Sequence, residues 1–288
     1  MATTTSSSMT EILNGKILAK TIRDKAKIRV EKLDTPPGLG VILVGENPAS
    51  MLYVGLKENA AKEVGIYVER TNLPSETTTE EILKIIEDFN HRKEINGILV
   101  QLPLPDGLDT DKIISAIEPI KDVDGFHPAN IQLLLESKPR LVPPTALAVM
   151  RLLQATHLPF HEKTAVIVGN SKVFADPIIE LMRDAGVAAQ YVEKNTEALA
   201  SITRAADILV TAIGTPYFIT PDMTKPSGVV IDVGTSKGPT GKTVGDGSPD
   251  LMNHTGFLSP VPGGVGPLTV AYLLLNVIKA KELQERES

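Results

Sequence analysis

The chain has 288 residues, of which 42% are hydrophobic, and its formal net charge is −6. This length favours one large or two ordinary domains with a substantial core. The negative charge, without a long run of one sign, argues against a nucleic-acid-binding surface and against a basic membrane-binding face. The sequence holds no cysteine, which excludes disulfides, thiolate catalysis and cysteine-ligated metals.

The first ten residues, Met1–Thr10, are rich in Ser and Thr and lack a basic start or an apolar stretch. We therefore expect a frayed terminus and no targeting segment, and we expect a cytoplasmic protein. No segment approaches the ~18 apolar residues of a membrane span. The five histidines show no ligand spacing, so we expect no metal site.

Strand-like and helix-like segments alternate along the chain, which is typical of an α/β protein with parallel sheets. In the first half we predict strands at 38–44, 67–73 and 97–100 and helices at 48–65, 78–89, 109–117 and 146–156. Pro143 and Pro144 open the last of these helices, because proline pre-sets the first helical turn.

A second series of elements begins at Lys163. We predict strands at 164–168, 188–192, 208–211 and 229–233, helices at 178–185 and 197–205, and a short turn near 221–224. This order suits a Rossmann-like, doubly wound nucleotide domain of about 110 residues. A long amphipathic helix at 268–285 closes the chain and could return to the first domain. We therefore assign residues 1–147 plus 270–288 to one α/β domain and 148–269 to the dinucleotide-binding domain.

The stretch T-A-V-I-V-G-N-S at 164–171 predicts a strand, a tight turn and a helix N-terminus, an arrangement that can hold a pyrophosphate. Glu193 follows about two dozen residues later, where a dinucleotide fold places an acid on the adenosine ribose. The full G-x-G-x-x-G spacing is absent, so a buried strand and turn of any α/β protein remains the alternative.

Tyr53 and Lys57 lie four residues apart in a predicted helix, which puts both side chains on one face. A lysine beside a tyrosine ring in a cleft can lose part of its solvation and become a usable proton carrier. The alternative is a surface lysine lying over an aromatic ring.

Gln101 directly follows the strand at 97–100, and ligands of α/β sheets collect outside the carboxyl ends of strands. A glutamine there can orient a water or a lysine, or it can be an ordinary loop residue. The loop Lys121–Gly125 carries two carboxylates. One could bind an amidine-like edge with two parallel hydrogen bonds, and a structural turn is the alternative. The glycine-rich run Pro262–Gly266 would let the backbone approach a ligand closely.

Together these residues resemble the bifunctional methylenetetrahydrofolate dehydrogenase/cyclohydrolase family over roughly residues 12–278. The resemblance is carried by V-G-E-N-P-A-S-M-L-Y-V-G-L-K at 44–57, G-I-L-V-Q-L-P-L-P at 97–105, K-D-V-D-G-F-H at 121–127 and P-V-P-G-G-V-G-P-L-T at 260–269. The catalytic residues of the family fall on Lys57, Tyr53 and Gln101, and its pterin-binding aspartate falls on Asp124.

The resemblance implies two α/β domains with a cleft between them, folate in the cleft and NAD or NADP on the C-terminal domain. It also implies a homodimer that acts on tetrahydrofolate derivatives, without a nucleic-acid or membrane partner. The implied substrate contacts are Tyr53, Val54, Gly55, Leu56, Lys57, Val100, Gln101, Leu102, Asp124, Pro262, Gly263, Gly264, Val265 and Gly266. The implied cofactor contacts are Gly169, Asn170, Ser171, Glu193, Lys194, Gly214 and Thr235.

Most departures from the family pattern lie in or beside the cofactor domain. Asn170 replaces a frequent arginine, Ala175 a usual glycine, and Thr235-Ser236 the usual Ile-Asn. Asn170 removes one cation that would face a 2′-phosphate, and Glu193 would repel such a phosphate, so we expect NAD over NADP. Lys172 and Lys194 argue for NADP.

Two other functions stay open at this point. The altered cofactor loop allows a monofunctional dehydrogenase or cyclohydrolase. A non-catalytic folate- or nucleotide-binding protein is the third possibility, against which the intact Tyr53, Lys57, Gln101 and Asp124 count.

Overall fold

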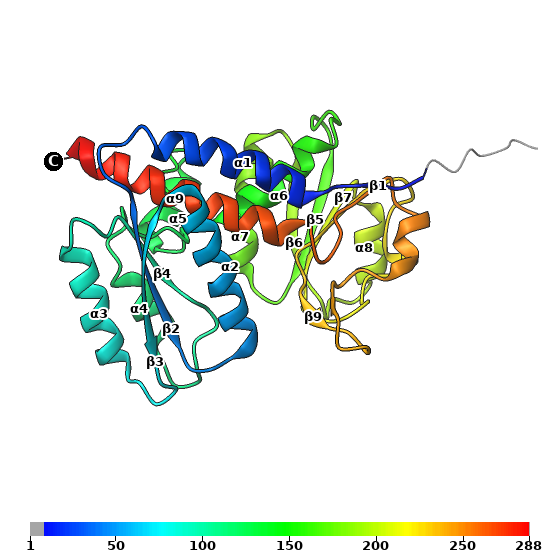
Figure 1. The fold of residues 1–288 in the computed structure, drawn as a ribbon. Helices are drawn as coiled ribbons and strands as arrows, with labels where there is room; N and C mark the ends of the chain where they lie inside the picture. Colours follow the sequence, from blue (N-terminus) through cyan, green and yellow to red (C-terminus); the bar gives the residue numbers. More distant parts are fainter. Residues whose placement is uncertain (1–8, 288) are drawn as a thin grey trace, which may run out of the picture. The chain divides into compact units, whose positions relative to one another are not determined.

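The computed structural model of the chain describes residues 9–287 (Figure 1). It divides into two compact units. Of the described residues, the first unit contains 19–144 and 269–287, and the second contains 145–268 and 9–18. None of the helices within residues 9–287 is long and apolar enough to cross a membrane.

The first unit is built on a three-stranded parallel sheet with the order β3-β2-β4. Its strands are β2 (Gly38–Val44), β3 (Tyr67–Leu73) and β4 (Gly97–Val100). Every residue of β2 and β4 is buried, as expected for parallel strands that are covered on both faces. The helices between and after these strands are α2 (Pro48–Val64), α3 (Thr79–His91), α4 (Thr110–Ser115) and α5 (Pro128–Leu135).

Both ends of α2 are fixed by local sequence. The Asn47 side chain accepts the backbone N–H groups of Ala49 and Ser50, and Pro48 occupies the first turn. Gly65 ends the helix with φ +88°, a left-handed conformation that glycine adopts without a steric penalty. The helix therefore holds Tyr53 and Lys57 in a fixed register along its axis.

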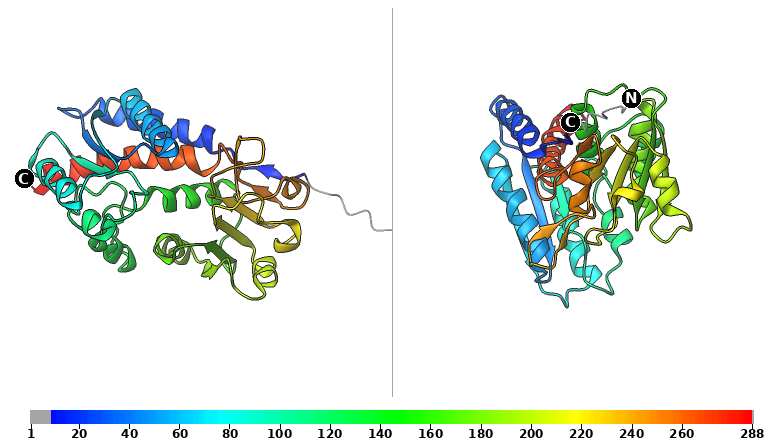
Figure 2. Two further views of the ribbon diagram at one scale, coloured as in Figure 1. Left: turned by 90° about the horizontal axis from the view of Figure 1, so that it is seen from below. Right: turned by 90° about the vertical axis from the view of Figure 1, so that its right-hand side faces the viewer.

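Two long helices contribute residues to both units: α1 (Gly15–Val30) and α9 (Val265–Glu287). Within the first unit they run side by side, as Figures 1 and 2 show for α1 in dark blue and α9 in red. Arg29 on α1 forms an ion pair with Glu282 on α9. Apolar residues of α9, among them Leu273 and Val277, join those of β2 in one core.

The second unit is built on a six-stranded parallel sheet with the order β1-β11-β8-β7-β5-β6. Its strands are β1 (Glu11–Ile12), β5 (Thr164–Gly169), β6 (Ala188–Glu193), β7 (Ile208–Ala212), β8 (Val229–Asp232) and β11 (Phe257–Leu258). A two-stranded hairpin is formed by β9 (Ser236–Lys237) and β10 (Thr243–Val244). The helical segments are α6 (Pro144–Ala155), α7 (Lys172–Asp184), α8 (Leu199–Ala205), η1 (Pro221–Met223) and η2 (Pro249–Asn253).

The strand order places a topological switch point between β5 and β7. The chain leaves β5 for β6 on one side and then crosses back to β7 on the other side. Ligands of open α/β sheets bind at such points, outside the carboxyl ends of the strands.

The predicted strands at 38–44, 67–73 and 97–100 match β2, β3 and β4, and the α/β class with a Rossmann-like sheet is confirmed. The helix predicted at 178–185 is wrong at its start, since α7 begins at Lys172. Pro177, which directly precedes the predicted start, lies buried inside α7. Helices α1 and α5 were not predicted.

The division into units differs from the predicted one at the N-terminus. The structure groups residues 9–18 with the second unit, whereas the sequence assigned all of 1–147 to the first domain. The reason is strand pairing, because Glu11 N–H donates to Gly256 O at 2.8 Å and Leu13 N–H donates to Leu258 O at 2.9 Å. The other boundaries fall at 144/145 and 268/269 instead of 147/148 and 269/270. The frayed terminus expected at Met1–Thr10 lies largely outside the described residues.

Candidate active site

Lys57 and Gln101 form a buried polar pair in the first unit. Lys57 comes from α2, Gln101 from the end of β4, and the Nζ of Lys57 donates to Oε1 of Gln101 at 3.0 Å. The exposed fractions are only 8% for Lys57 and 9% for Gln101. The pair brings together two residues that are 44 positions apart in the sequence.

Gln101 is held on two further sides. Its backbone N–H donates to Ile42 O at 2.9 Å, which continues the pairing of β4 with β2. Its side-chain Nε2 donates to the carbonyl of Leu102 at 2.6 Å. Because the amide nitrogen is used there, the amide oxygen remains for the lysine ammonium.

Asp122 and Asp124, the two carboxylates of the loop after α4, have different roles. Asp122, only 1% exposed, accepts the backbone N–H groups of Gly125 at 3.0 Å and His127 at 2.8 Å. It also accepts Nδ2 of Asn130 at 2.9 Å. Burial raises the pKa of Asp122, and these hydrogen bonds act against that rise. Asp122 thus stabilises the turn that contains it.

Helix α9 fixes the same loop from another side. Nδ2 of the buried Asn276 donates to Val123 O at 2.8 Å and to Val142 O at 2.9 Å. Gly125 has φ +71°, and a Cβ there would lie 2.6 Å from the nitrogen of Pro143. The backbone is therefore fixed on both sides of Asp124.

Asp124 itself is half-buried and is left for another role. Burial raises the pKa of its carboxyl group, and the positive charge of Lys57 acts in the opposite direction. Lys57 therefore has Gln101 in hydrogen-bond contact and the Asp124 carboxylate within electrostatic reach in the first unit.

Tyr53 lies one turn before Lys57 on α2 and is half-buried. The neighbouring surface of the helix is open, since a Cβ at Gly55 would meet no atom within 4 Å and Leu56 is 49% exposed. A flat ligand would have room to lie against this part of α2.

Lys121 has a role that sequence reasoning missed. Its Nζ donates to the carbonyls of Phe89 at 3.0 Å, Asn90 at 2.6 Å and Arg92 at 2.9 Å, where α3 ends. Burial lowers the pKa of Lys121. This lysine caps a helix and anchors the Asp124 loop.

In the second unit, the candidate cofactor residues gather at the carboxyl ends of four neighbouring strands. Gly169 ends β5, Glu193 ends β6, Gly214 follows β7 and Thr235 follows β8. Gly169 lies beside Glu193 in the strand register and beside Ala212 on its other side. This is the arrangement that sequence reasoning predicted for a dinucleotide site.

The turn between β5 and α7 is short. Ser171 precedes α7 and its side chain makes no capping hydrogen bond, which leaves the hydroxyl at the N-terminus of the helix for another partner. Asn170 is exposed and its Nδ2 donates to Ile213 O at 2.6 Å. The hydroxyl of Tyr191, which was not predicted as a site residue, donates to Gly169 O at 3.1 Å. Lys172 forms an ion pair with Asp176, and Lys194 is half-buried.

Two glycines of the run Pro262–Gly266 are needed for close backbone packing within the second unit. Gly263 has φ +117°, and Gly264 lies so close to α1 that a Cβ on Gly15 would be 1.8 Å from its carbonyl oxygen. Only at Gly266 would an added Cβ meet nothing within 4 Å. Close packing within the chain thus accounts for Gly263 and Gly264, whereas Gly266 has open space.

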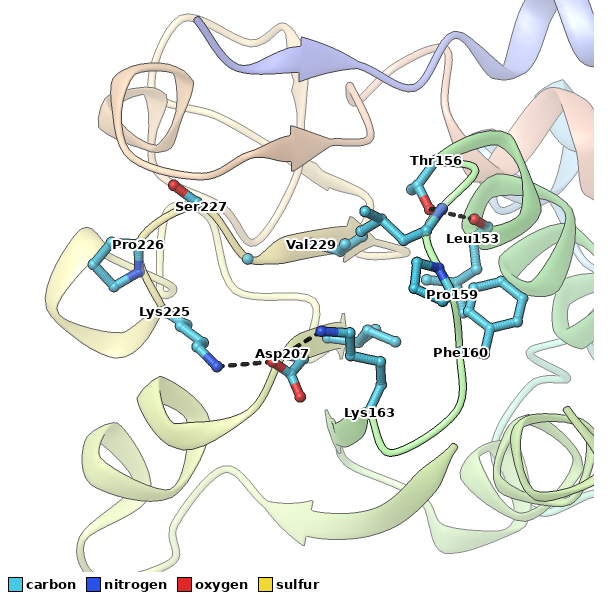
Figure 3. A pocket seen from close by; sticks show the side chains of 13 residues that line it. Leu153, Thr156, Pro159, Phe160, Lys163, Asp207, Lys225, Pro226, Ser227 and Val229 are labelled. Carbon is cyan, nitrogen blue, oxygen red and sulfur yellow. Dashed lines mark hydrogen bonds and ion pairs between the residues drawn. The ribbon is translucent and has the colours of Figure 1, made fainter. Parts of the chain in front are cut away.

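A separate cavity of about 240 Å³ lies at the opposite end of the second sheet (Figure 3). Its lining includes Lys163, Asp207 and Gly228, which directly precede β5, β7 and β8. Nζ of Lys225 lies 2.8 Å and Nζ of Lys163 lies 3.9 Å from Oδ1 of Asp207, as drawn in Figure 3. The charged groups of this cavity are thus paired with each other, at the amino ends of strands whose carboxyl ends carry the candidate cofactor residues.

No group of three or more His, Asp or Glu side chains within residues 9–287 is arranged to hold a metal ion.

The fold and the site define a protein of two α/β units, of which the second has the sheet and strand-end residues of a dinucleotide-binding domain. Two family models match the chain: the tetrahydrofolate dehydrogenase/cyclohydrolase catalytic domain over residues 13–124 and the NAD(P)-binding domain of the same family over residues 143–285. The chain belongs to the tetrahydrofolate dehydrogenase/cyclohydrolase family, as its motifs predicted.

Relatives match over nearly the whole chain. The bifunctional protein FolD of Aliarcobacter butzleri is 41% identical over 280 residues, which cover 96% of this chain and 98% of the relative. The crystal structure of the bifunctional FolD enzyme of Campylobacter jejuni is 38% identical, with a TM-score of 0.91 and coverage of 96% and 99%. The Trypanosoma brucei FolD structure, complexed with NADP and an inhibitor, is 32% identical, with a TM-score of 0.92 and coverage of 97% and 99%.

Proposed function

We propose that this protein oxidises 5,10-methylenetetrahydrofolate to 5,10-methenyltetrahydrofolate with NAD(P) and hydrolyses the product to 10-formyltetrahydrofolate. The observation that carries the proposal is the buried Lys57–Gln101 pair, with Asp124 near it, in a chain of this family. A nicotinamide cofactor, when bound, supplies the acceptor for the hydride that leaves the methylene bridge. The adjacent folate nitrogen stabilises the resulting cation, so this step needs placement and no protein acid or base.

The second reaction needs proton transfer. Water adds to the methenyl carbon and gives up both of its protons as the formyl C=O forms. One proton is taken up by the ring nitrogen that is freed when its carbon–nitrogen bond breaks, and the other is released to solvent. Lys57 is the candidate proton carrier, because its Nζ is buried and held by a single side-chain oxygen at 3.0 Å. Gln101 orients the lysine, and Tyr53 packs against the pterin one helical turn away.

Asp124 binds the pterin in this proposal. Two parallel donors on an amidine-like edge would satisfy both oxygens of the carboxylate. Such donors would also favour the ionised form of a group whose pKa is raised by burial. The substrate would further contact Val54, Gly55, Leu56, Val100, Leu102 and the run Pro262–Gly266.

The second unit binds the NAD(P) cofactor, and we propose NAD as the preferred form. Asn170 brings no cation for a 2′-phosphate, and its amide is engaged with Ile213 O. Glu193 is exposed beside Gly169, where its carboxylate would accept a ribose hydroxyl and repel a phosphate. Lys172, which would favour NADP, is paired with Asp176. A preference for NADP of tenfold or more in kcat/KM, about 1.4 kcal/mol, would reverse this assignment.

The test is an absorbance assay of the purified protein. Methylenetetrahydrofolate is supplied separately with NAD and with NADP, and methenyltetrahydrofolate is supplied alone. We expect cofactor reduction in the first assay and hydrolysis above background in the second. If only one of the two reactions occurs, the monofunctional alternative holds.

Lys57→Met tests the assigned role. The variant should lose methenyl hydrolysis, and it should retain part of the hydride transfer, which needs placement alone. Hydrolysis by the variant at the wild-type rate would show that Lys57 does not carry the proton.

A homodimer, which the family resemblance implies, and a cytoplasmic location, which the composition of residues 1–10 led us to expect, are the remaining parts of the proposal. Light scattering of the purified protein and fractionation of the source cells would check them.

A further inference from the structure

Two aspartates in the second unit are buried next to each other. Asp232 ends β8 and is 4% exposed, and Asp246 follows β10 and is 0% exposed. Two buried carboxylates without a cation in contact are costly, so their hydrogen-bond partners indicate what they stabilise.

Asp246 holds the loop after β7. Its Oδ2 accepts the hydroxyl of Thr211 at 2.8 Å and the N–H of Ile213 at 2.7 Å. Its Oδ1 accepts the N–H of Thr215 at 2.9 Å. A single carboxylate therefore fixes the backbone on both sides of Gly214.

Asp232 holds the loop after β8 and also holds Asp246. Its Oδ1 accepts the N–H of Gly234 at 2.9 Å and that of Asp246 at 3.2 Å, and its Oδ2 accepts the N–H of Gly247 at 2.8 Å. The fit is close, because a Cβ on Gly234 would lie 2.3 Å from Oδ1 of Asp246.

The same network reaches the turn after β5. Ile213, whose N–H binds Asp246, accepts Nδ2 of Asn170 on its carbonyl oxygen at 2.6 Å. The loops at the carboxyl ends of β5, β7 and β8 are thus joined by hydrogen bonds that converge on Asp246 and Asp232. These are the strand ends on which the α/β architecture places a ligand.

We propose that Asp246 and Asp232 are positioning residues for the nicotinamide cofactor: they hold the loops around Gly214 and Thr235 in the shape that receives it. The inference rests on the proposed function, since it assigns these loops to cofactor binding. A variant with disturbed loops should therefore lose the dehydrogenase reaction and keep the hydrolysis of methenyltetrahydrofolate, which does not consume the cofactor.

The test is Asp246→Asn, which replaces one accepting oxygen by an NH₂ group that faces a donor. We expect the Kd for NAD or NADP, measured by calorimetry, and the cofactor KM to rise at least tenfold. The methenyl hydrolysis rate should stay within twofold of the wild-type rate. Asp250→Asn, an exposed aspartate of η2 in the same unit, is the matched control and should leave both quantities unchanged.

An unchanged cofactor Kd, or an equal loss of hydrolysis and cofactor binding, would overturn the proposal, since a merely structural role lowers both together. Thr211→Val removes one donor to Asp246 at nearly constant volume, and it serves if Asp246→Asn does not fold. That variant should raise the cofactor Kd at least threefold with hydrolysis unchanged, and an unchanged Kd would again refute the inference. Wild-type protein without either reaction would instead contradict the proposed function.

Discussion

Asp232 should make the stability of this protein depend on pH in a direction opposite to that of most carboxylates. Burial, together with the charge of Asp246, raises the pKa of Asp232 from 3.8 to about 7, against the effect of its three backbone hydrogen bonds. The folded state therefore holds a proton that the unfolded state has lost between pH 4 and pH 7. By linkage, the contribution of this group to the free energy of unfolding falls as the pH rises through that window.

The magnitude follows from the same two pKa values. Between the unfolded pKa and the folded pKa of Asp232, each pH unit changes the free energy of unfolding by about 1.4 kcal/mol, and the range from pH 5 to pH 7 covers about two such units. Between pH 5 and pH 8 the wild type should therefore lose about 2 to 3 kcal/mol relative to Asp232→Asn, which cannot titrate. In a unit of this size that corresponds to a relative shift in Tm on the order of 10 °C.

The assay is denaturant or thermal unfolding of both proteins at pH 5, 6, 7 and 8. The difference between wild type and variant cancels the titration of all other groups. We expect this difference to move steadily against the wild type as the pH rises. A difference that stays constant within about 0.5 kcal/mol, or that moves in favour of the wild type, would show that Asp232 is ionised throughout.

Two further substitutions test the first unit. Asp124→Ala should weaken the binding of a folate analogue by roughly 1.5–3 kcal/mol, because it removes a charged hydrogen-bond pair. Calorimetry that finds an unchanged Kd would show that Asp124 does not contact the pterin. Lys121→Met should lower the free energy of unfolding by about 2–4 kcal/mol, because three carbonyls at the end of α3 lose their donor. Urea unfolding would measure this loss, and a change below about 0.5 kcal/mol would mean that water replaces the ammonium.

Local patterns in the sequence were sufficient for most strands. The run at 38–44 contains Val, Ile and Leu between glycines, which predicts a buried strand without knowledge of its neighbours. Helix α1 was missed although Asn14 before it accepts the backbone N–H of Ile17, because its sixteen residues carry no proline, capping box or closing glycine to strengthen that one signal. The start of α7 was missed because Pro177 has the same local signature inside a helix as at its first turn.

The candidate site was predictable to the extent that its residues lie in motifs. Tyr53, Lys57, Gln101 and Asp124 could be named from the sequence, but the 3.0 Å contact between Lys57 and Gln101 depends on how α2 packs against the sheet, where it contacts β2 and β3. Lys121 was read as part of a turn, since its partners at the end of α3 lie about thirty residues earlier. Asp232 and Asp246 carried no signal, because a buried carboxylate pair is defined by tertiary contacts alone.

The two units cannot be produced as separate, continuous fragments of the chain without losing part of each. The second unit includes β1 from the N-terminus, and the first unit includes most of α9 from the C-terminus. A gene fragment that ends at Pro144 would lack Leu273, Leu274 and Val277, which belong to the core around β2. A fragment that begins at Thr145 would leave the edge of β11 without its β1 partner. Each unit thus depends on a segment from the far end of the polypeptide, so synthesis of the chain must be complete before the first unit can close its core.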